Sequence, residues 1–239
     1  MKVIVESSED IASSAAQGYV SFIENKPNAV LGLATGSTPE SLYAQLIERC
    51  NKGDVSFKNV TTFNLDEYAG LPTDHPQSYR YFMQDKLFDH IDINPANTHV
   101  PDAFNTTEDD MLAYDKAIAD AGGIDLQLLG IGVNGHIAFN EPGTPFNSLT
   151  HVVELTQETR EVNSRFFNSL DEVPTHAICM GMKTIMNCQN IILIALGKNK
   201  AQAVHDTIYG EITPDCPASV LQLHPNVTVF ADKEAASLL

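Results

Sequence analysis

The sequence is poor in positive charge. Its 239 residues include 14 Lys and Arg against 31 Asp and Glu, which gives a formal net charge of −17. A chain with this charge repels phosphate backbones at long range, so we expect no nucleic-acid partner. Any phosphorylated ligand must therefore be small and held by a local group of cations.

Long apolar runs are also missing. The longest stretches, such as residues 191–196, fall far short of the roughly 20 residues that a membrane-spanning helix needs, so we expect no membrane partner. Residues 1–5 lead straight into a strand-like pattern, without the basic region, apolar run and cleavage site of a secretory signal. We therefore expect a cytoplasmic protein.

Cysteines are few and widely separated. The chain has four, with no C-x-x-C pair and no His at zinc-ligand spacing. We expect reduced, mostly buried thiols and no metal site. The four residues are Cys50, Cys179, Cys188 and Cys216.

What the sequence does contain is an alternation of short β-branched runs and helical patterns. Nearly continuous apolar strands between helices are typical of an α/β fold with a mostly parallel sheet covered on both faces. No linker or repeat divides the chain, so we expect a single domain over residues 1–239. The predicted strands are 3–5, 29–34, 60–65, 124–130, 152–155, 176–179, 190–196 and 227–230, and the predicted helices are 9–23, 40–49, 77–88, 108–121, 157–168 and 200–208.

In such sheets ligands bind at the carboxyl ends of the strands. After the second predicted strand comes the small-residue loop Thr35-Gly36-Ser37-Thr38, with Pro39 at a suitable first helical position. Free backbone N–H groups and the helix dipole would favour a phosphate there. The alternative is that these residues form an ordinary strand-to-helix turn with a Ser or Thr cap.

The third predicted strand leads into Asp66 and Glu67. A carboxylate at a strand end is well placed for general-base chemistry, and a neighbouring acid raises its pKa by disfavouring a second negative charge. A solvated loop or a helix cap is the alternative. The pair by itself does not say which of the two acids would act.

Residues 130–135 spell G-x-G-x-x-G after a strand, the fingerprint of a dinucleotide site. That site needs a helix at the last glycine, and here Pro142, Gly143 and Pro145 would break a helix early. The same loop instead offers Asn134, His136 and Glu141, a polar cluster able to hold an imidazole for acid-base work. His136 and Glu141 lack a third clear metal ligand.

Cations that come after a strand or a glycine turn are candidates for binding a phosphate. Arg165 stands beside aromatic residues, and Lys198 and Lys200 flank Asn199 after a glycine. Surface salt bridges are the alternative for each. Spacing alone does not choose between Lys198 and Lys200.

Together, five segments resemble the glucosamine-6-phosphate deaminase family, nearly end to end. They are residues 31–39, 62–68, 130–142, 163–167 and 219–224. The resemblance implies a Rossmann-like α/β fold that is shared with 6-phosphogluconolactonases and with sugar-phosphate sensors of some transcription regulators. It also implies conversion of glucosamine 6-phosphate and water to fructose 6-phosphate and ammonia, by an isomerase and hydrolase that needs no cofactor.

By the same resemblance, Asp66 is the general base that moves a proton from C2 to C1. His136 opens the sugar ring with the help of Glu141, and Asn134 stands where some members have Asp. Asn orients an imidazole but does not stabilise its cation as a carboxylate does, so a charge relay through Asn134 is not expected. The residues that match the substrate-phosphate site are Thr35, Gly36, Ser37, Thr38, Arg165 and Lys200.

Two rival functions and the oligomeric state complete the expectations. A 6-phosphogluconolactonase-like hydrolase would need no base at C2, and a non-catalytic sensor would normally carry a DNA-binding module.

Hexameric members of the resembled family bind an anionic effector through basic residues after the Asn-Glu-Pro segment. This chain has no Lys or Arg between Pro142 and Thr159, so we expect a monomer or small homo-oligomer that binds a small amino-sugar phosphate.

Overall fold

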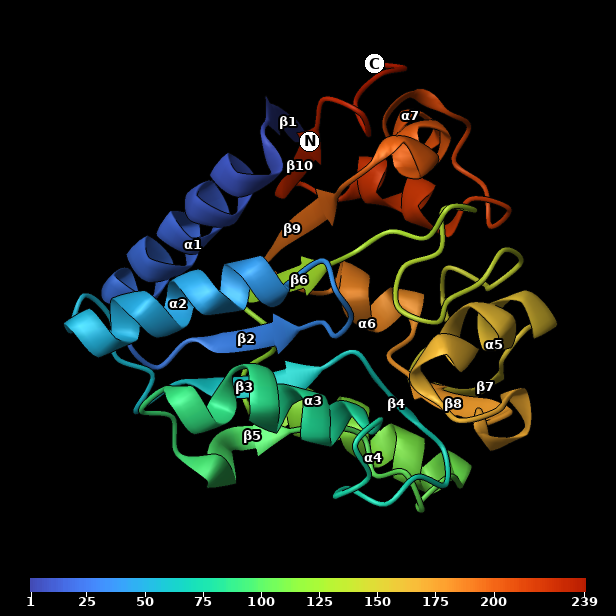
Figure 1. The fold of residues 1–239 in the computed structure, drawn as a ribbon, viewed down its shortest axis with the longest axis horizontal. Helices are drawn as coiled ribbons and strands as arrows, with labels where there is room; N and C mark the ends of the chain where they lie inside the picture. The colour runs from blue at the N-terminus through green and yellow to red at the C-terminus, as the bar shows by residue number, and fades with distance from the viewer.

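A seven-stranded sheet in which every pairing is parallel forms the centre of the protein (Figure 1). The computed structural model describes residues 1–157, 159–161, 163–165 and 167–239. The parallel sheet confirms the predicted fold class. In spatial order the strands are β1 (Lys2–Glu6), β10 (Val227–Asp232), β9 (Asn190–Ala195), β6 (Leu126–Leu129), β2 (Val30–Leu33), β3 (Thr61–Asn64) and β5 (Thr98–His99).

Several of the helices begin at a Ser or Thr whose side chain caps them. Ser7 accepts a hydrogen bond from the Asp10 backbone at the start of α1 (Ser8–Asn25). Thr107 and Asp110 form a capping box at the start of α4 (Glu108–Asp120). The remaining helices are α2 (Glu40–Lys52), α3 (Tyr79–Lys86), α5 (Gln157–Asn163), α6 (Met182–Met186) and α7 (Ala201–Tyr209), with short 3₁₀ turns η1 (Phe88–His90), η2 (Pro95–Asn97), η3 (Ser164–Phe166), η4 (Leu170–Glu172), η5 (Lys198–Lys200) and η6 (Pro217–Leu223).

A second, smaller sheet departs from the sequence prediction. It contains β4 (Asp66–Tyr68), β8 (His176–Cys179) and β7 (His151–Glu154), all antiparallel. Strands at 152–155 and 176–179 were predicted correctly, but their assignment to the mostly parallel sheet is wrong. Strand β4 was not predicted. The apolar pattern of a strand shows which face is buried, but it does not show which strand lies beside it.

Leu65 joins the two sheets. Its backbone N–H donates to the carbonyl of Leu33 in β2 at 3.1 Å, and its own carbonyl accepts from Met180, just after β8, at 2.7 Å. The chain therefore leaves the large sheet at Asn64 and enters the small sheet at Asp66. This junction fixes the backbone of Asp66 between two hydrogen-bonded sheets.

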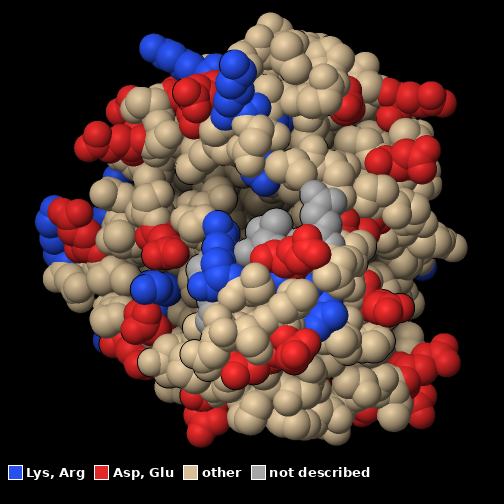
Figure 2. Space-filling model, turned by 45° about the vertical axis from the view of Figure 1, so that its right-hand side comes forward, with Lys and Arg blue, Asp and Glu red and all other residues tan. Residues whose placement is uncertain are grey.

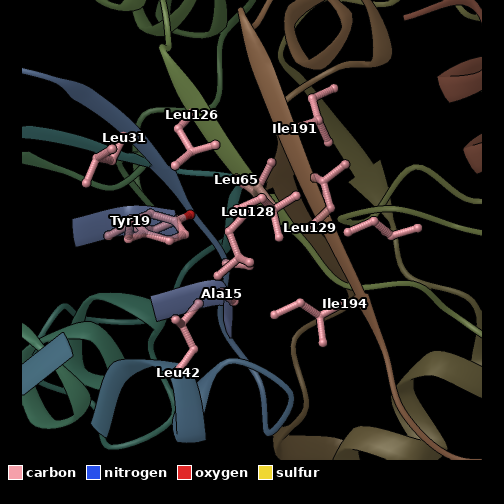
Figure 3. Packing of buried hydrophobic residues seen from close by; sticks show 14 of the residues in the cluster. Ala15, Tyr19, Leu31, Leu42, Leu65, Leu126, Leu128, Leu129, Ile191 and Ile194 are labelled. Carbon is pink, nitrogen blue, oxygen red and sulfur yellow. The ribbon is translucent and has the colours of Figure 1, made fainter. Parts of the chain in front are cut away.

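The main core lies between the large sheet and its helices. Figure 3 shows Ala15 and Tyr19 of α1 and Leu42 of α2 close to side chains of the central strands, among them Leu31 and Leu128. These five residues are at most 1% exposed. Burial of each large apolar side chain contributes roughly 1.5–3 kcal/mol. Within the described part of the chain, no helix is long and apolar enough to cross a membrane.

Gly32 in the middle of the sheet makes room for a polar side chain. Gln127 of β6 is its register partner and is fully buried. The Gln127 side chain lies over Gly32, where an added Cβ would come within 1.9 Å of Oε1. Nε2 of Gln127 donates to the Leu128 carbonyl at 2.8 Å, and Oε1 has no hydrogen-bond partner among the described residues.

We expect Gly32→Ala to lower the free energy of unfolding by about 1–3 kcal/mol, because the new methyl group displaces a buried side chain. The free energy is measured by urea unfolding. Gln127→Ala vacates the same space, so the double variant should lose clearly less than the two single variants together. Losses that add within about 0.5 kcal/mol would show that the two positions do not compete for space.

Candidate active site

A cavity of about 620 Å³ opens at the carboxyl ends of four adjacent strands, β9, β6, β2 and β3. The chain passes from β2 outward to β3 and β5 and then returns to β6 on the other side of β2. This reversal is the place where open α/β sheets bind ligands. Figure 2 shows a face that is hollowed near its centre, with basic side chains beside the hollow and acidic ones over the surrounding surface.

Nine of the ten predicted site residues line this cavity, and they come from distant parts of the chain. The tenth, Glu141, lies behind Asn134 and His136 and contacts both. Lys200 is among the lining residues and Lys198 is not. The nine lining residues are Thr35, Gly36, Ser37, Thr38, Asp66, Asn134, His136, Arg165 and Lys200.

One part of the cavity carries the features of an anion site. The loop 35–38 stands between β2 and the 13-residue helix α2, and Gly36 has a positive φ of 93°. The first N–H groups of a helix have no intrahelical partner and favour an anion. Arg165 and Lys200 line the same cavity. Burial lowers the pKa of Lys200, a cost that a bound anion would offset.

Glu67 does not share the position of Asp66. Its side chain accepts hydrogen bonds from the backbone N–H groups of Tyr68, Tyr79 and Arg80 at 2.8, 2.8 and 2.9 Å. Two of these donors belong to the first turn of α3, so Glu67 caps that helix. It thereby positions Tyr79, which lines the cavity. Glu67 fits the helix-cap alternative, whereas Asp66 faces the cavity.

Asp66 is a buried carboxyl group that opens onto the cavity. The residue is 7% exposed and pairs with Cys179 across the small sheet. Burial, and then the negative charge of Glu67, raise the pKa of Asp66 to about 8. The group is therefore mostly protonated at neutral pH while the cavity is empty.

His136 is held by its neighbours in one orientation. Its Nδ1 lies 2.7 Å from Oδ1 of Asn134, and its backbone N–H donates to the same oxygen at 3.2 Å. Nδ2 of Asn134 donates to Oε2 of Glu141 at 2.8 Å, which fixes the orientation of the amide. Because Oδ1 only accepts, neutral His136 carries its hydrogen on Nδ1 and leaves the Nε2 lone pair for a ligand.

Glu141 supplies the charge that Asn134 lacks. Its Oε2 lies 3.4 Å from Nδ1 of His136. Burial alone would raise the pKa of Glu141, but interactions with His136, Asn134 and Thr159 outweigh it and lower the pKa to about 2. A permanent carboxylate at this distance stabilises an imidazolium. The expectation that Asn134 itself does not carry that charge agrees with this geometry, since Glu141 is the anion.

The glycines of the loop serve close packing and not a dinucleotide. A Cβ on Gly132 would lie 2.2 Å from the His136 ring, so only glycine lets the imidazole lie flat against the loop. The backbone N–H of Gly132 also donates to the His136 carbonyl at 2.8 Å. Residues 130–150 form no helix, as the prolines predicted. The G-x-G-x-x-G motif is therefore not followed by the helix that a dinucleotide site needs.

Several lining residues were not predicted. Tyr79 reaches the cavity from α3, and Thr159 and Asn163 reach it from α5. Oγ1 of Thr159 donates to Oε1 of Glu141 at 3.0 Å, so α5 holds the second carboxylate oxygen. Neither α3 nor α5 comes directly after a strand of the large sheet, so a search of the residues just beyond each strand misses them. Also lining the cavity are Thr156 and Asn199.

The fold and the site together define the class of protein. Residues 5–230 match the family described as glucosamine-6-phosphate isomerases/6-phosphogluconolactonase. The chain belongs to this family. The match covers every strand that contributes to the cavity, and it covers both sheets apart from residues 2–4 of β1 and 231–232 of β10.

Within that family the chain is similar to glucosamine-6-phosphate deaminases. It is 52% identical to the one from Thermoanaerobacter pseudethanolicus, over 100% of this chain and 95% of the relative. It is also 52% identical to the one from Mycoplasma mycoides subsp. mycoides, over 100% and 98%. A solved monomeric glucosamine-6-phosphate deaminase superposes with a TM-score of 0.97 at 48% identity, over 100% of both chains.

The second branch of the family shares the fold at much lower identity. The 6-phosphogluconolactonase from Trypanosoma brucei superposes with a TM-score of 0.76 at 21% identity, over 100% of this chain and 98% of that one. Identity of this size shows the fold alone. The expectation of a fold common to deaminases and lactonases is confirmed.

Thr159→Val should raise the pKa of Glu141 from about 2 towards the ordinary Glu range, because the variant loses a hydrogen bond to the ionised carboxylate and keeps the side-chain shape. The titration is followed by NMR of the labelled Glu141 carboxyl carbon. Thr159→Ser keeps the donor and should titrate like the parent chain. An unchanged pKa in Thr159→Val would mean that α5 does not hold this carboxylate.

Proposed function

We propose that this protein converts glucosamine 6-phosphate and water to fructose 6-phosphate and ammonia. The observation that carries the proposal is one cavity that combines a loop before a helix, two cations, a buried carboxyl group and an oriented imidazole. The relatives that are about half identical over the full chain bear the name of this reaction. Isomerisation and hydrolytic release of ammonia are both part of the proposal.

Substrate binding begins at the phosphate. The backbone of residues 35–38, with Arg165 and Lys200, holds the phosphate group through charge-assisted hydrogen bonds. This contact lies at C6, far from the carbons that react. The binding energy of the phosphate thus fixes the position of C1 and C2 against the catalytic groups.

Ring opening is the task of His136. Its Nε2 takes the proton of the C1 hydroxyl and returns it to the ring oxygen, which breaks the C1–O5 bond and gives the open-chain aldehyde. The Asn134 contact at Nδ1 keeps Nε2 directed away from the loop. The Glu141 carboxylate, 3.4 Å from Nδ1, stabilises the imidazolium that forms between the two transfers.

The proton shift is the task of Asp66. As a carboxylate it removes the C2 proton while O1 gains a proton from the ammonium group at C2, which gives an enolamine. It then delivers the C2 proton to C1, which leaves a protonated imine at C2. Water adds to that imine carbon, the C–N bond breaks, and ammonia leaves with fructose 6-phosphate. These steps involve no net oxidation or reduction of the sugar. Two positioned titratable groups suffice, and we propose that the enzyme needs no cofactor.

We further propose that the protein works as a monomer. The support is its full-length similarity to a monomeric glucosamine-6-phosphate deaminase, together with the lack of Lys and Arg between Pro142 and Thr159.

The direct test is production of fructose 6-phosphate and ammonia from glucosamine 6-phosphate by purified protein treated with a chelator. Asp66→Asn should remove at least about 99% of turnover, because it deletes the base. His136→Gln should impair the cyclic substrate much more than an open-chain analogue. Hydrolysis of 6-phosphogluconolactone without release of ammonia would contradict the proposal and favour the lactonase alternative.

Lys198 and Lys200 give a matched control in the same assay. Lys200→Ala should raise KM about tenfold or more, because a charged contact to phosphate contributes about 1.5–3 kcal/mol. Lys198→Ala removes the same charge two residues away, outside the cavity lining, and should leave KM nearly unchanged. Equal effects of the two variants would point to long-range charge and not to a phosphate contact.

A further inference from the structure

The cavity has an uneven distribution of charge. Its permanent cations, Arg165 and Lys200, accompany the loop 35–38. Among the described lining residues Asp66 is the one carboxyl group, and it is only 7% exposed. A ligand that fits this cavity therefore presents an anionic group to the loop and another kind of group to Asp66.

Among the described residues, the groups that act electrostatically on Asp66 include no cation. The charged one is Glu67, another acid. The others are neutral side chains on elements packed around it: the phenols of Tyr43, Tyr68, Tyr79 and Tyr114 and the thiol of Cys179. A buried carboxylate without a compensating charge is unstable, so Asp66 in the empty cavity is held as the neutral acid.

A neutral carboxylic acid does not act as a general base. Only the ionised fraction of Asp66 removes a proton from C2, and a cation beside the carboxyl group would enlarge that fraction. The backbone of β4 pairs with β8 and is joined to the large sheet through Leu65, so the position of the Asp66 backbone is fixed. A ligand that carries a cation to this position would supply the charge.

We propose that this cation is the ammonium group at C2 of the substrate, and that Asp66 recognises it. This inference rests on the proposed function. On binding, the Asp66 carboxyl releases its proton to solvent and the resulting carboxylate pairs with the ammonium group. No other bond forms or breaks in this step. The same carboxylate is then available to take the neighbouring C2 proton.

Recognition and catalysis are thereby joined in one residue. A sugar phosphate with a hydroxyl group at C2 brings no cation, so it leaves Asp66 mostly protonated and should be isomerised far more slowly. An N-acetylated amine is neutral and has the same defect. The substrate class is therefore aldose phosphates that carry a free ammonium group at C2. Other sugar phosphates are disfavoured in two ways, because they bind less tightly and because they do not ionise the Asp66 base.

The test compares two alditol phosphates, which have no carbonyl carbon and are not turned over. They are 2-amino-2-deoxyglucitol 6-phosphate, whose aliphatic amine is an ammonium at pH 7, and glucitol 6-phosphate. Calorimetric titration at pH 7 in buffers of different ionisation enthalpy counts the protons released on binding. Protons from the phosphate are common to both ligands and cancel in the difference.

We expect the amino ligand to release roughly 0.9 proton more than the hydroxyl ligand, because a carboxyl group with a pKa of about 8 is about nine-tenths protonated at pH 7. The difference should vanish in Asp66→Asn. Equal proton release from the two ligands in the parent chain would overturn the inference and leave the proposed function standing. A difference in proton release that persists in Asp66→Asn would also overturn the inference.

A second measurement does not depend on the folding of a variant. Below pH 8 the amino ligand displaces a proton on binding, so the ratio of its affinity to that of glucitol 6-phosphate should rise with pH, approaching tenfold per unit. A ratio that stays constant from pH 5.5 to 7.5 would overturn the inference. If neither alditol phosphate binds at millimolar concentration, the proposed function fails and the inference fails with it.

Discussion

The placement of Asp66 between two sheets is the constraint on which the rest of the site depends. Leu65 bonds to both sheets, and the next residue is therefore buried on every side except the cavity. That burial costs stability, since among the described residues the charged neighbour of this carboxyl group is another acid. A carboxyl group in such surroundings is a candidate functional group.

The site separates two carboxyl groups by their surroundings. Burial and Glu67 hold Asp66 protonated, whereas hydrogen bonds and the nearby His136 hold Glu141 ionised, with pKa values of about 8 and about 2. Such a separation assigns different tasks to chemically similar groups. In the proposed reaction Asp66 changes its charge, and Glu141 keeps a constant charge that orients and stabilises His136.

The sequence predicted the strands of the large sheet, except the two-residue β5, and most of the residues that line the cavity, because both depend on local patterns. Residues 191–195 of β9 are continuously apolar, and Asp66, His136 and Lys200 stand shortly after strands. The small sheet was not predicted, because an alternating pattern does not reveal a strand's neighbours. Thr159 was missed for the same reason: it reaches Glu141 only because the small sheet brings α5 over the cavity.

The most direct measurement is the titration of Asp66 itself in the ligand-free protein. Carbon-13 NMR of Asp side-chain carboxyl groups, with Asp66→Asn used to assign the resonance, gives its pKa without reference to activity. We expect one Asp resonance to titrate near pH 8, far above the ordinary Asp range. A value for Asp66 at or below about 4 would mean that a counter-charge is already present in the empty cavity, and it would contradict both the electrostatic picture of the site and the amine recognition built on it.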